Sequence, residues 1–426
     1  MAVPVSAKGV AVPYAGHLWY GGSIEDDEPT PELRWPMSVQ VYDAMSNQES
    51  QVASVLRAVW LPVRRTTWRL DGSGCSDHVT SRVAEDLGLP IMGKGPNPAR
   101  RARDRFSFAE HLRLALLMHR YGHSYFEQVY RPDGREYRLR KLMWLPPRTL
   151  SAFNVAADGG LSSIEQDASK NGPLEVARLV AYVNEREGGN WLGRSMLRSA
   201  YKYWLLKDQM LRVGAQTVRR NGMGVPIYTA GPEPEGLSPE ELVARETAEM
   251  EAGLKLAQDF RSGEAAGASI RNGASLRLAG VDGRLPDALP WVRYYDEQTA
   301  RAVLAHFLNL GGDNSTGSYA LGDTFADFFA SSLQSVAQDF ADTFNQHVIE
   351  DLVDVNWGPD EPAPRLVFDE IGARHPATAD AIRSLVDSGV ITPDEALEAH
   401  MRMTYGLPLA DPNTARERAG TGGIDG

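Results

Sequence analysis

The sequence predicts an α+β fold with several lobes, in which two long helices accompany short strands. The 426 residues, 42% of them hydrophobic, can bury a sizeable core and suggest two to four lobes. Two long stretches, 195–220 and 322–353, have the composition and apolar spacing of helices. Short strand-like segments at 124–130 and 136–144 flank Pro132-Asp133-Gly134, which predicts a hairpin. Helical and strand patterns are therefore mixed, and neither an all-α nor an all-β fold is favoured.

The first long helix should span roughly 39 Å over 195–220, at about 1.5 Å per residue. Gly222 and Gly224 end it, and the following segment 225–228 resembles an edge strand. The second long helix carries an apolar series at helical spacing: Phe325, Phe328, Phe329, Leu333, Val336, Phe340, Phe344 and Val348.

A helix start is encoded at Ser238, which is followed by Pro239, Glu240 and Glu241. Serine suits the cap, proline suits the first helical position, and acids suit the first turn. We therefore predict a helix from 238 to about 261. Further helices are predicted at 38–59, 108–119, 174–184, 296–310, 377–388 and 392–404, and further strands at 61–70, 275–278 and 365–368.

The composition limits the classes of function. A net charge of −12 and a pI near 5.3 argue against a protein that coats DNA, although DNA could slide past it. The single cysteine, Cys75, excludes an intrachain disulfide. The start, 1–16, lacks the features of a signal peptide, and no stretch reaches the ~18 apolar residues of a membrane helix. We expect a soluble product made in the cytoplasm, with no membrane partner.

Charge is segregated along the chain. Residues 100–141 contain 11 Arg or Lys against 5 Asp or Glu, whereas 323–354 contain 7 Asp or Glu and no Arg or Lys. This pattern suits subunits that pack side by side through complementary faces. The acidic helix could instead repel DNA in a channel, and two solvated faces would give the same pattern, so these readings stay open.

No catalytic, cofactor or metal site is predicted. Gly312 and Gly317 have the spacing of a phosphate loop, but Ser318 and Tyr319 stand where the motif requires lysine followed by serine or threonine. His119 and His123 could share a helix face, yet no third metal ligand is evident, and packing or solvent-facing histidines are favoured.

Several blocks in order resemble the portal proteins of tailed bacteriophages, in particular the branch that includes the Mu-type portal. They are NWLGRSMLRSAYKYWLLKDQML (190–211), GMGVPIY (222–228), RSGEAAGASIRNGASLRL (261–278), YYDEQTARAVLAHFLNL (294–310), GSYALGDTF (317–325), LVDVNWG (352–358), PRLVF (364–368) and LVDSGVITPDEALEAHMRMTYGLP (385–408). The likeness covers more than half of the chain, whereas residues 1–100 match poorly.

The resemblance implies the portal fold, assembled as a ring, with a wing, a long-helix stem, a small α/β clip and a helical crown. Its implied divisions are an N-terminal arm (1–36), the first part of the wing (37–190), stem helix 1 (191–222), the clip (223–290), stem helix 2 (291–310), a tunnel loop (311–322), a long helix with the return into the wing (323–370), the crown (371–410) and a flexible tail (411–426).

The resemblance also implies a function in the virion rather than an enzymatic one. The ring, usually a dodecamer, sits at one capsid vertex and passes double-stranded DNA during packaging and ejection. Its implied partners are the terminase large subunit, the head–tail adaptor, and the major capsid and scaffold proteins. A minor head or assembly protein of a phage virion, or a nucleic-acid-processing enzyme, remains an alternative.

Two groups of candidate site residues follow. The tunnel loop would bring small polar side chains to the DNA, where weak hydrogen bonds to phosphate suit sliding: Asn314, Ser315, Thr316, Ser318 and Tyr319. An ordinary interhelix loop would look the same. The first stem helix offers Trp204, Lys207 and Arg212 as stem residues.

Overall fold

The computed structural model describes residues 28–94, 106–156, 158–167, 172–221, 225–232, 235–260, 269–270, 272–279, 287–302, 319–372, 383–384, 386–389 and 398. The chain divides into two units, 1–371 and 372–426. In the second unit, 383–384 and 386–387 are helical, within the predicted helix 377–388. Most of the predicted arm, crown and tail lies outside the described residues, as does the body of the predicted tunnel loop.

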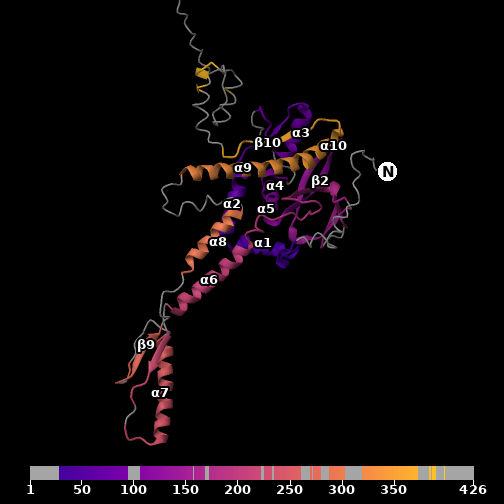
Figure 1. The fold of residues 1–426 in the computed structure, drawn as a ribbon. Helices are drawn as coiled ribbons and strands as arrows, with labels where there is room; N and C mark the ends of the chain where they lie inside the picture. The colour runs from indigo at the N-terminus through magenta and orange to yellow at the C-terminus, as the bar shows by residue number, and fades with distance from the viewer. Residues whose placement is uncertain are drawn as a thin grey trace, which may run out of the picture. The chain divides into compact units, whose positions relative to one another are not determined.

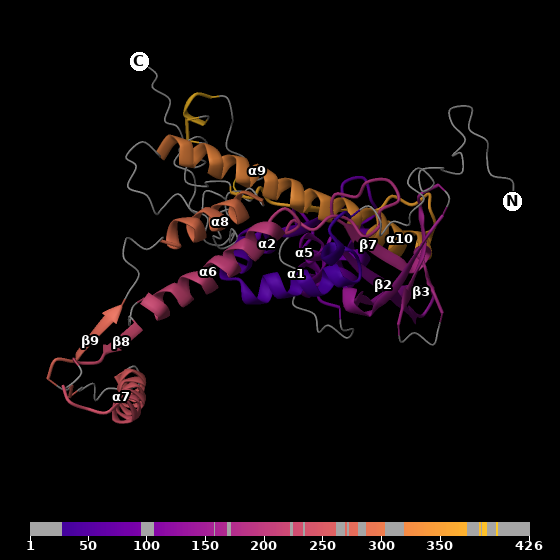
Figure 2. The ribbon, with the colours of Figure 1, turned by 60° about the horizontal axis from the view of Figure 1, so that its bottom comes forward.

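The first unit is α+β, as predicted, and its strands form small antiparallel sheets (Figures 1 and 2). Its helices are α1 (Met37–Gln48), α2 (Ser50–Arg65), α3 (Asp77–Leu87), α4 (Phe108–Ala115), α5 (Met118–Tyr121), α6 (Tyr201–Asn221), α7 (Pro239–Phe260), α8 (Leu289–Ala302), α9 (Tyr319–Phe344) and α10 (Glu350–Trp357). Short 3₁₀ turns lie at Pro31–Leu33, Pro147–Thr149 and Val176–Arg178.

Four sheets are present among the described residues. The strand orders are β3-β2-β7, β4-β5-β6, β1-β10 and β8-β9. The strands are β1 (Trp68–Asp71), β2 (His123–Asp133), β3 (Glu136–Leu145), β4 (Leu150–Val155), β5 (Leu161–Gln166), β6 (Leu174–Glu175), β7 (Leu179–Val183), β8 (Val225–Thr229), β9 (Ser275–Ala279) and β10 (Arg365–Phe368). The predicted hairpin is confirmed as β2 and β3, and the predicted strands near 225, 275 and 365 are β8, β9 and β10.

Two predicted elements are wrong, and the predicted helix 38–59 is two helices, α1 and α2, separated by an extended Glu49. The segment 174–184 is not a helix, because β7 pairs with β2 and alternating side chains such as Val180 and Tyr182 are buried. The segment 61–70 is not one strand, because α2 continues to Arg65 and includes Pro62. Val63 is buried and completes the apolar stripe of that helix, so core packing outweighs the loss of one backbone donor.

The main core joins α2, α4, β2 and β7 to α9. Tyr182 of β7 stacks on Phe340 of α9 with ring centroids 5.3 Å apart. Trp68 meets the same Phe340 at 5.3 Å and Phe368 of β10 at 4.9 Å. Aromatic pairs of this kind add about 0.5–1.5 kcal/mol each to the burial of area. Packing against the early strands therefore fixes α9, which comes from the far end of the unit.

The predicted helix 322–353 is interrupted by a π-helical turn at Asn345–Ile349 before α10. The side chain of Asn345 accepts the backbone N–H of Leu366 at 2.7 Å and donates to its carbonyl at 3.4 Å. This bonding to β10 accounts for a local departure from regular α-helix, since single π turns arise where side chains serve neighbouring structure.

The chain enters α6 through a close backbone crossing. His123, at the start of β2, donates from Nδ1 to the carbonyl of Leu192 at 2.9 Å. Gly193 has φ +64°, and a Cβ there would lie 2.7 Å from the carbonyl oxygen of Asn184. Glycine is required at this crossing because any side chain would collide with backbone. Ser195 donates to the carbonyl of Arg120 at 2.6 Å, and α6 begins only at Tyr201, later than predicted.

Candidate assembly surface on the stem helices

Helices α6 and α8 pack side by side over much of their length (Figures 1 and 2). On α6 the contact face uses Tyr203, Lys207 and Gly214, at helical spacings of four and seven. Tyr203 lies against Tyr295 with ring centroids 6.4 Å apart. A Cβ at Gly214 would be 3.2 Å from Cβ of Ala288, so glycine permits a close approach there. Helices α6 and α8 therefore form a packed pair.

Lys207 is the polar centre of this pair. Its Nζ donates to Oδ1 of Asp296 on α8 at 2.5 Å and to Oε1 of Glu49 at 2.7 Å. The Lys207 side chain is only 9% exposed, and those of Glu49 and Asp296 are 14% and 28% exposed. Glu49 also caps α2 by accepting the N–H of Gln51. One ammonium thus connects α2, α6 and α8.

The electrostatics of this network favour its protonated lysine. Burial opposes the charge of Lys207, but the hydrogen bonds and charges of Asp296 and Glu49 outweigh it and raise the pKa of Lys207 above 10.5. Burial raises the pKa of Asp296, which Lys207 only partly counters. A buried amine held between two carboxylates is stabilised only while its acceptors are present, and removal of the amine would leave two neighbouring carboxylates without a cation.

The other two stem candidates have different environments. Trp204 is half-buried and packs on a small core with Tyr42, Met45 and Leu56 from α1 and α2. Arg212 is 77% exposed and bonds to Asp208, one turn earlier on the same helix, at 2.6 Å. The structure therefore brings Trp204 and Lys207 to the base of the helix pair and leaves Arg212 on the surface.

Both outer flanks of α6 expose large apolar side chains. Leu206 and Val213 lie on one flank and are 42% and 56% exposed. Leu211 and Val218 lie on the other flank, at 46% and 71%. On α8, Trp291 is 55% exposed. Apolar surface is therefore left uncovered within the subunit on both flanks of α6.

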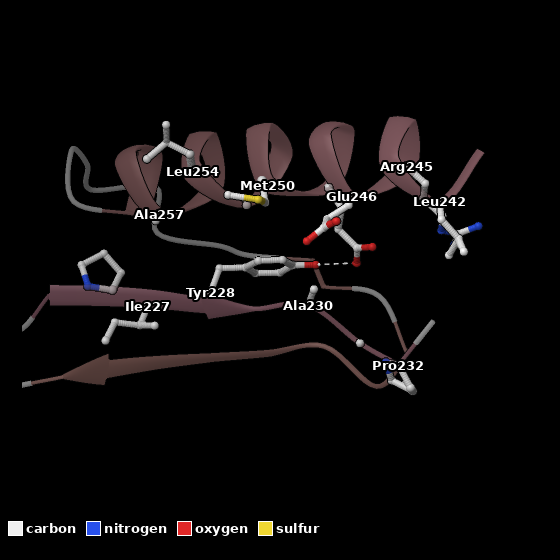
Figure 3. Close-up of a pocket in the computed structure, with 14 residues that line it drawn as sticks. Ile227, Tyr228, Ala230, Pro232, Leu242, Arg245, Glu246, Met250, Leu254 and Ala257 are labelled. Atoms are coloured by element: carbon white, nitrogen blue, oxygen red, sulfur yellow. Dashed lines mark hydrogen bonds between the residues drawn. The ribbon is translucent and has the colours of Figure 1, made fainter. Parts of the chain in front are cut away.

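A cavity of about 430 Å³ lies between α7 and the hairpin of β8 and β9 (Figure 3). Tyr228 of β8 points toward α7, and its hydroxyl donates to Glu249 at 3.4 Å. Gly253 faces the Tyr228 ring, which leaves no room for a Cβ. Met250 and Leu254 at the cavity are 67% and 61% exposed. The predicted start of α7 is confirmed, since Ser238 and Glu241 exchange capping hydrogen bonds.

The DNA-loop candidates Asn314, Ser315, Thr316 and Ser318 lie outside the described residues. Tyr319 is the first residue of α9, and nothing further is described of its side chain. That these five residues contact DNA in the channel therefore stays a prediction from the sequence.

The histidines noted in the sequence are core residues. His119 and His123 are buried, and His123 lies on a strand, not on a helix with His119. Burial lowers the pKa of each to about 4, despite one backbone hydrogen bond apiece. No cluster of three metal-ligating side chains occurs within the described part of the chain. Every helix in that part is also too short or too polar to span a bilayer.

The basic segment 100–141 is partly neutralised within the chain. Of its seven described basic residues, Arg113 pairs with Glu110, Arg120 with Asp43, Arg138 with Asp86, and Arg131 with Asp133. The acidic segment 323–354 has no such partners among the described residues. Sequence reasoning missed this difference, because the partners of Arg120 and Arg138 lie 77 and 52 positions away.

Apolar side chains exposed on two flanks of a helix that extends from an α+β base are typical of a subunit that packs against other protein molecules. Residues 39–407 match the family described as the portal protein of Mu bacteriophage. The chain therefore belongs to the Mu portal protein family, as the sequence blocks indicated. This family consists of structural phage proteins and not of enzymes.

Solved structures share the fold. A chain from the neck of an empty gene transfer agent particle, computed with C6 symmetry, is 13% identical with a TM-score of 0.55; the match covers 87% of this chain and 94% of that one. A chain from the neck of the native particle, computed with C12 symmetry, is 14% identical with a TM-score of 0.53, over 87% and 94%. A chain from the virion of the native gene transfer agent particle is 13% identical with a TM-score of 0.52, and the match covers 88% of this chain and 95% of that one.

Proposed function

We propose that twelve copies of this chain form a closed ring at one vertex of a phage capsid, and that double-stranded DNA enters and leaves through its centre. The single observation that carries the proposal is the family membership of residues 39–407. The two apolar flanks of α6 support it, because a subunit in a ring contacts each of two neighbours through a different face. The C12 symmetry of one similar neck supports the number twelve.

The proposed divisions are those implied by the sequence. Helices α6 and α8 form the stem, and the segment 223–290, with its cavity, forms the clip. Loop 311–322 borders the channel, where polar side chains and a net charge of −12 would let DNA slide without tight ion pairing. The exposed Met250 and Leu254 give the clip an apolar surface on which the terminase large subunit, and later the head–tail adaptor, could dock.

The test is the mass and symmetry of the purified protein, by native mass determination and negative-stain class averages. The expected particle has a central hole and a mass of about 560 kDa, which is twelve times 46.7 kDa. A stable species of 46.7 kDa at all concentrations would contradict the ring.

A further inference from the structure

Helix α2 carries a basic face on the side turned away from the core. Arg57, Arg64 and Arg65 are exposed there, with Leu61 between them at 49% exposure. The spacings of four and three residues place Arg57, Leu61 and Arg64 on one stripe of the helix. Val59, on the opposite side, is buried. We define the basic face as Arg57, Leu61, Arg64 and Arg65.

Helix α9 carries an acidic face, also on the side opposite its buried residues (Figure 1 labels both helices). Asp327, Asp339 and Asp342 are exposed, with Phe328 at 60% exposure. No lysine or arginine occurs from 323 to 354 to offset them. We define the acidic face as Asp327, Phe328, Asp339 and Asp342.

Neither face is neutralised within its own subunit. Among the described residues, no ion pair joins any of these three arginines or three aspartates to another group. Glu110, the acid near Arg64, already bonds to Arg113 at 2.5 Å. Burial, and then the charge of Asp342, raise the pKa of Asp339, so a cation docked there would relieve crowding between acids.

We propose that the basic face of one subunit docks on the acidic face of the next subunit around the ring. The contact pairs arginines of the basic face with Asp339 and Asp342 of the acidic face. It is a head-to-tail contact between two different faces of one chain, which is the type that closes a ring. The inference rests on the proposed ring and specifies how neighbours choose one another.

A second copy fits these observations better than DNA does. Binding to phosphates would use the basic face alone, in a chain of net charge −12. It would leave the acidic face without a role. Complementary charge also orients partners and excludes wrong contacts, since like charges brought together cost several kcal/mol.

The test is a charge exchange in the full chain. One variant reverses the basic face (Arg57→Glu with Arg65→Glu), a second reverses the acidic face (Asp339→Arg with Asp342→Arg), and a third combines all four changes. A control, Arg140→Glu with Arg277→Glu, makes the same change in charge at exposed positions elsewhere. Circular dichroism and melting establish that each variant is folded, because all the altered side chains are exposed. Ring formation is then measured by native mass and negative stain.

We expect each two-site reversal to raise the concentration needed for half-maximal assembly by at least about tenfold. The combined variant should lower that concentration again to near the wild-type value. The control should assemble like the wild type. Wild-type assembly should also weaken with added salt, because exposed charges are screened.

The outcomes separate the two proposals. If the wild type forms no ring, the proposed function fails, and this contact fails with it. If the wild type forms rings and the reversals do so equally, the contact alone is overturned. Loss of rings in both reversals without recovery in the combined variant would also overturn it, since each face would then serve a different partner. Binding of duplex DNA that the basic-face reversal abolishes, with rings intact, would assign that face to DNA.

Discussion

Nζ of Lys207 on α6 lies 2.7 Å from Oε1 of Glu49, a residue 158 positions earlier that caps α2. The same ammonium reaches Asp296 on α8. Helices α6 and α8 are thus joined to α2 by one buried cation. Removal of that cation would leave two carboxylates close together without compensation.

Replacement of Lys207 by Met should therefore lower the free energy of unfolding by about 3 kcal/mol, the low end for breaking a buried pair. Urea denaturation at pH 7 measures this loss. Arg212→Met, on the exposed side of the same helix, is the control and should change stability little. The pKa of Lys207 is raised on folding, so its contribution is present below pH 10.5 and is lost as the pH rises through the folded pKa. An equal free energy of unfolding for Lys207→Met and wild type would show that the network does not stabilise the fold.

Trp204→Ala should destabilise the base of the stem by about 2 kcal/mol. A fully buried tryptophan would cost about 3–5 kcal/mol, but this side chain is only half-buried against Tyr42, Met45 and Leu56. The melting temperature and urea midpoint check the value, with Gln209→Ala at an exposed position of α6 as the control. No change in either quantity would mean that Trp204 does not pack on this core.

Acid should destabilise the region of α5 and β2 through its buried histidines. Burial lowers the pKa of His123 to about 4, so folding excludes a proton that the unfolded chain binds below about 6.5. The histidine contribution is thus intact above pH 6.5 and declines as the pH falls from 6.5 toward 4, by about 1.4 kcal/mol per pH unit. His123→Asn should lack this contribution, so the stability difference between wild type and variant should change with pH between 6.5 and 4, as measured by urea denaturation at several pH values. His78→Asn, at an exposed site, is the control. Parallel pH profiles for His123→Asn and wild type would refute this assignment.

Deletion of 313–317 should spare ring assembly and impair DNA packaging. The deletion leaves α6, α8 and the described part of α9 unchanged, and the loop is proposed to border the channel. Ring formation is followed by negative stain, and packaging by the length of protected DNA in assembled particles. A matched change is replacement of the same five residues by a Gly/Ser segment of equal length, which separates loop chemistry from loop length. Normal genome length in the deletion variant would exclude a role in the channel.

Local sequence determined much of this fold. Ser238 and Glu241 specify the start of α7, because a cap and its reciprocal acid act within one turn. Pro132-Asp133-Gly134 specifies the hairpin of β2 and β3 for the same local reason. The order and spacing of longer blocks identified the family, since each block keeps its place along the chain.

The tertiary structure decided what depends on distant partners. Residues 179–183 became a strand because β2 offers them a pairing edge, against a local pattern that suggested a helix. The network of Lys207 needs Glu49, 158 positions away, and Asp296, 89 positions away. Arg120 pairs with the buried Asp43 and Arg138 with the buried side chain of Asp86, whereas no ion pair is described for the exposed arginines of α2. The sequence by itself determined the fold class, the family and the local turns. Only the packing of the chain decided which charges are neutralised within the subunit and which remain for a neighbour, because ion pairing depends on distances in space.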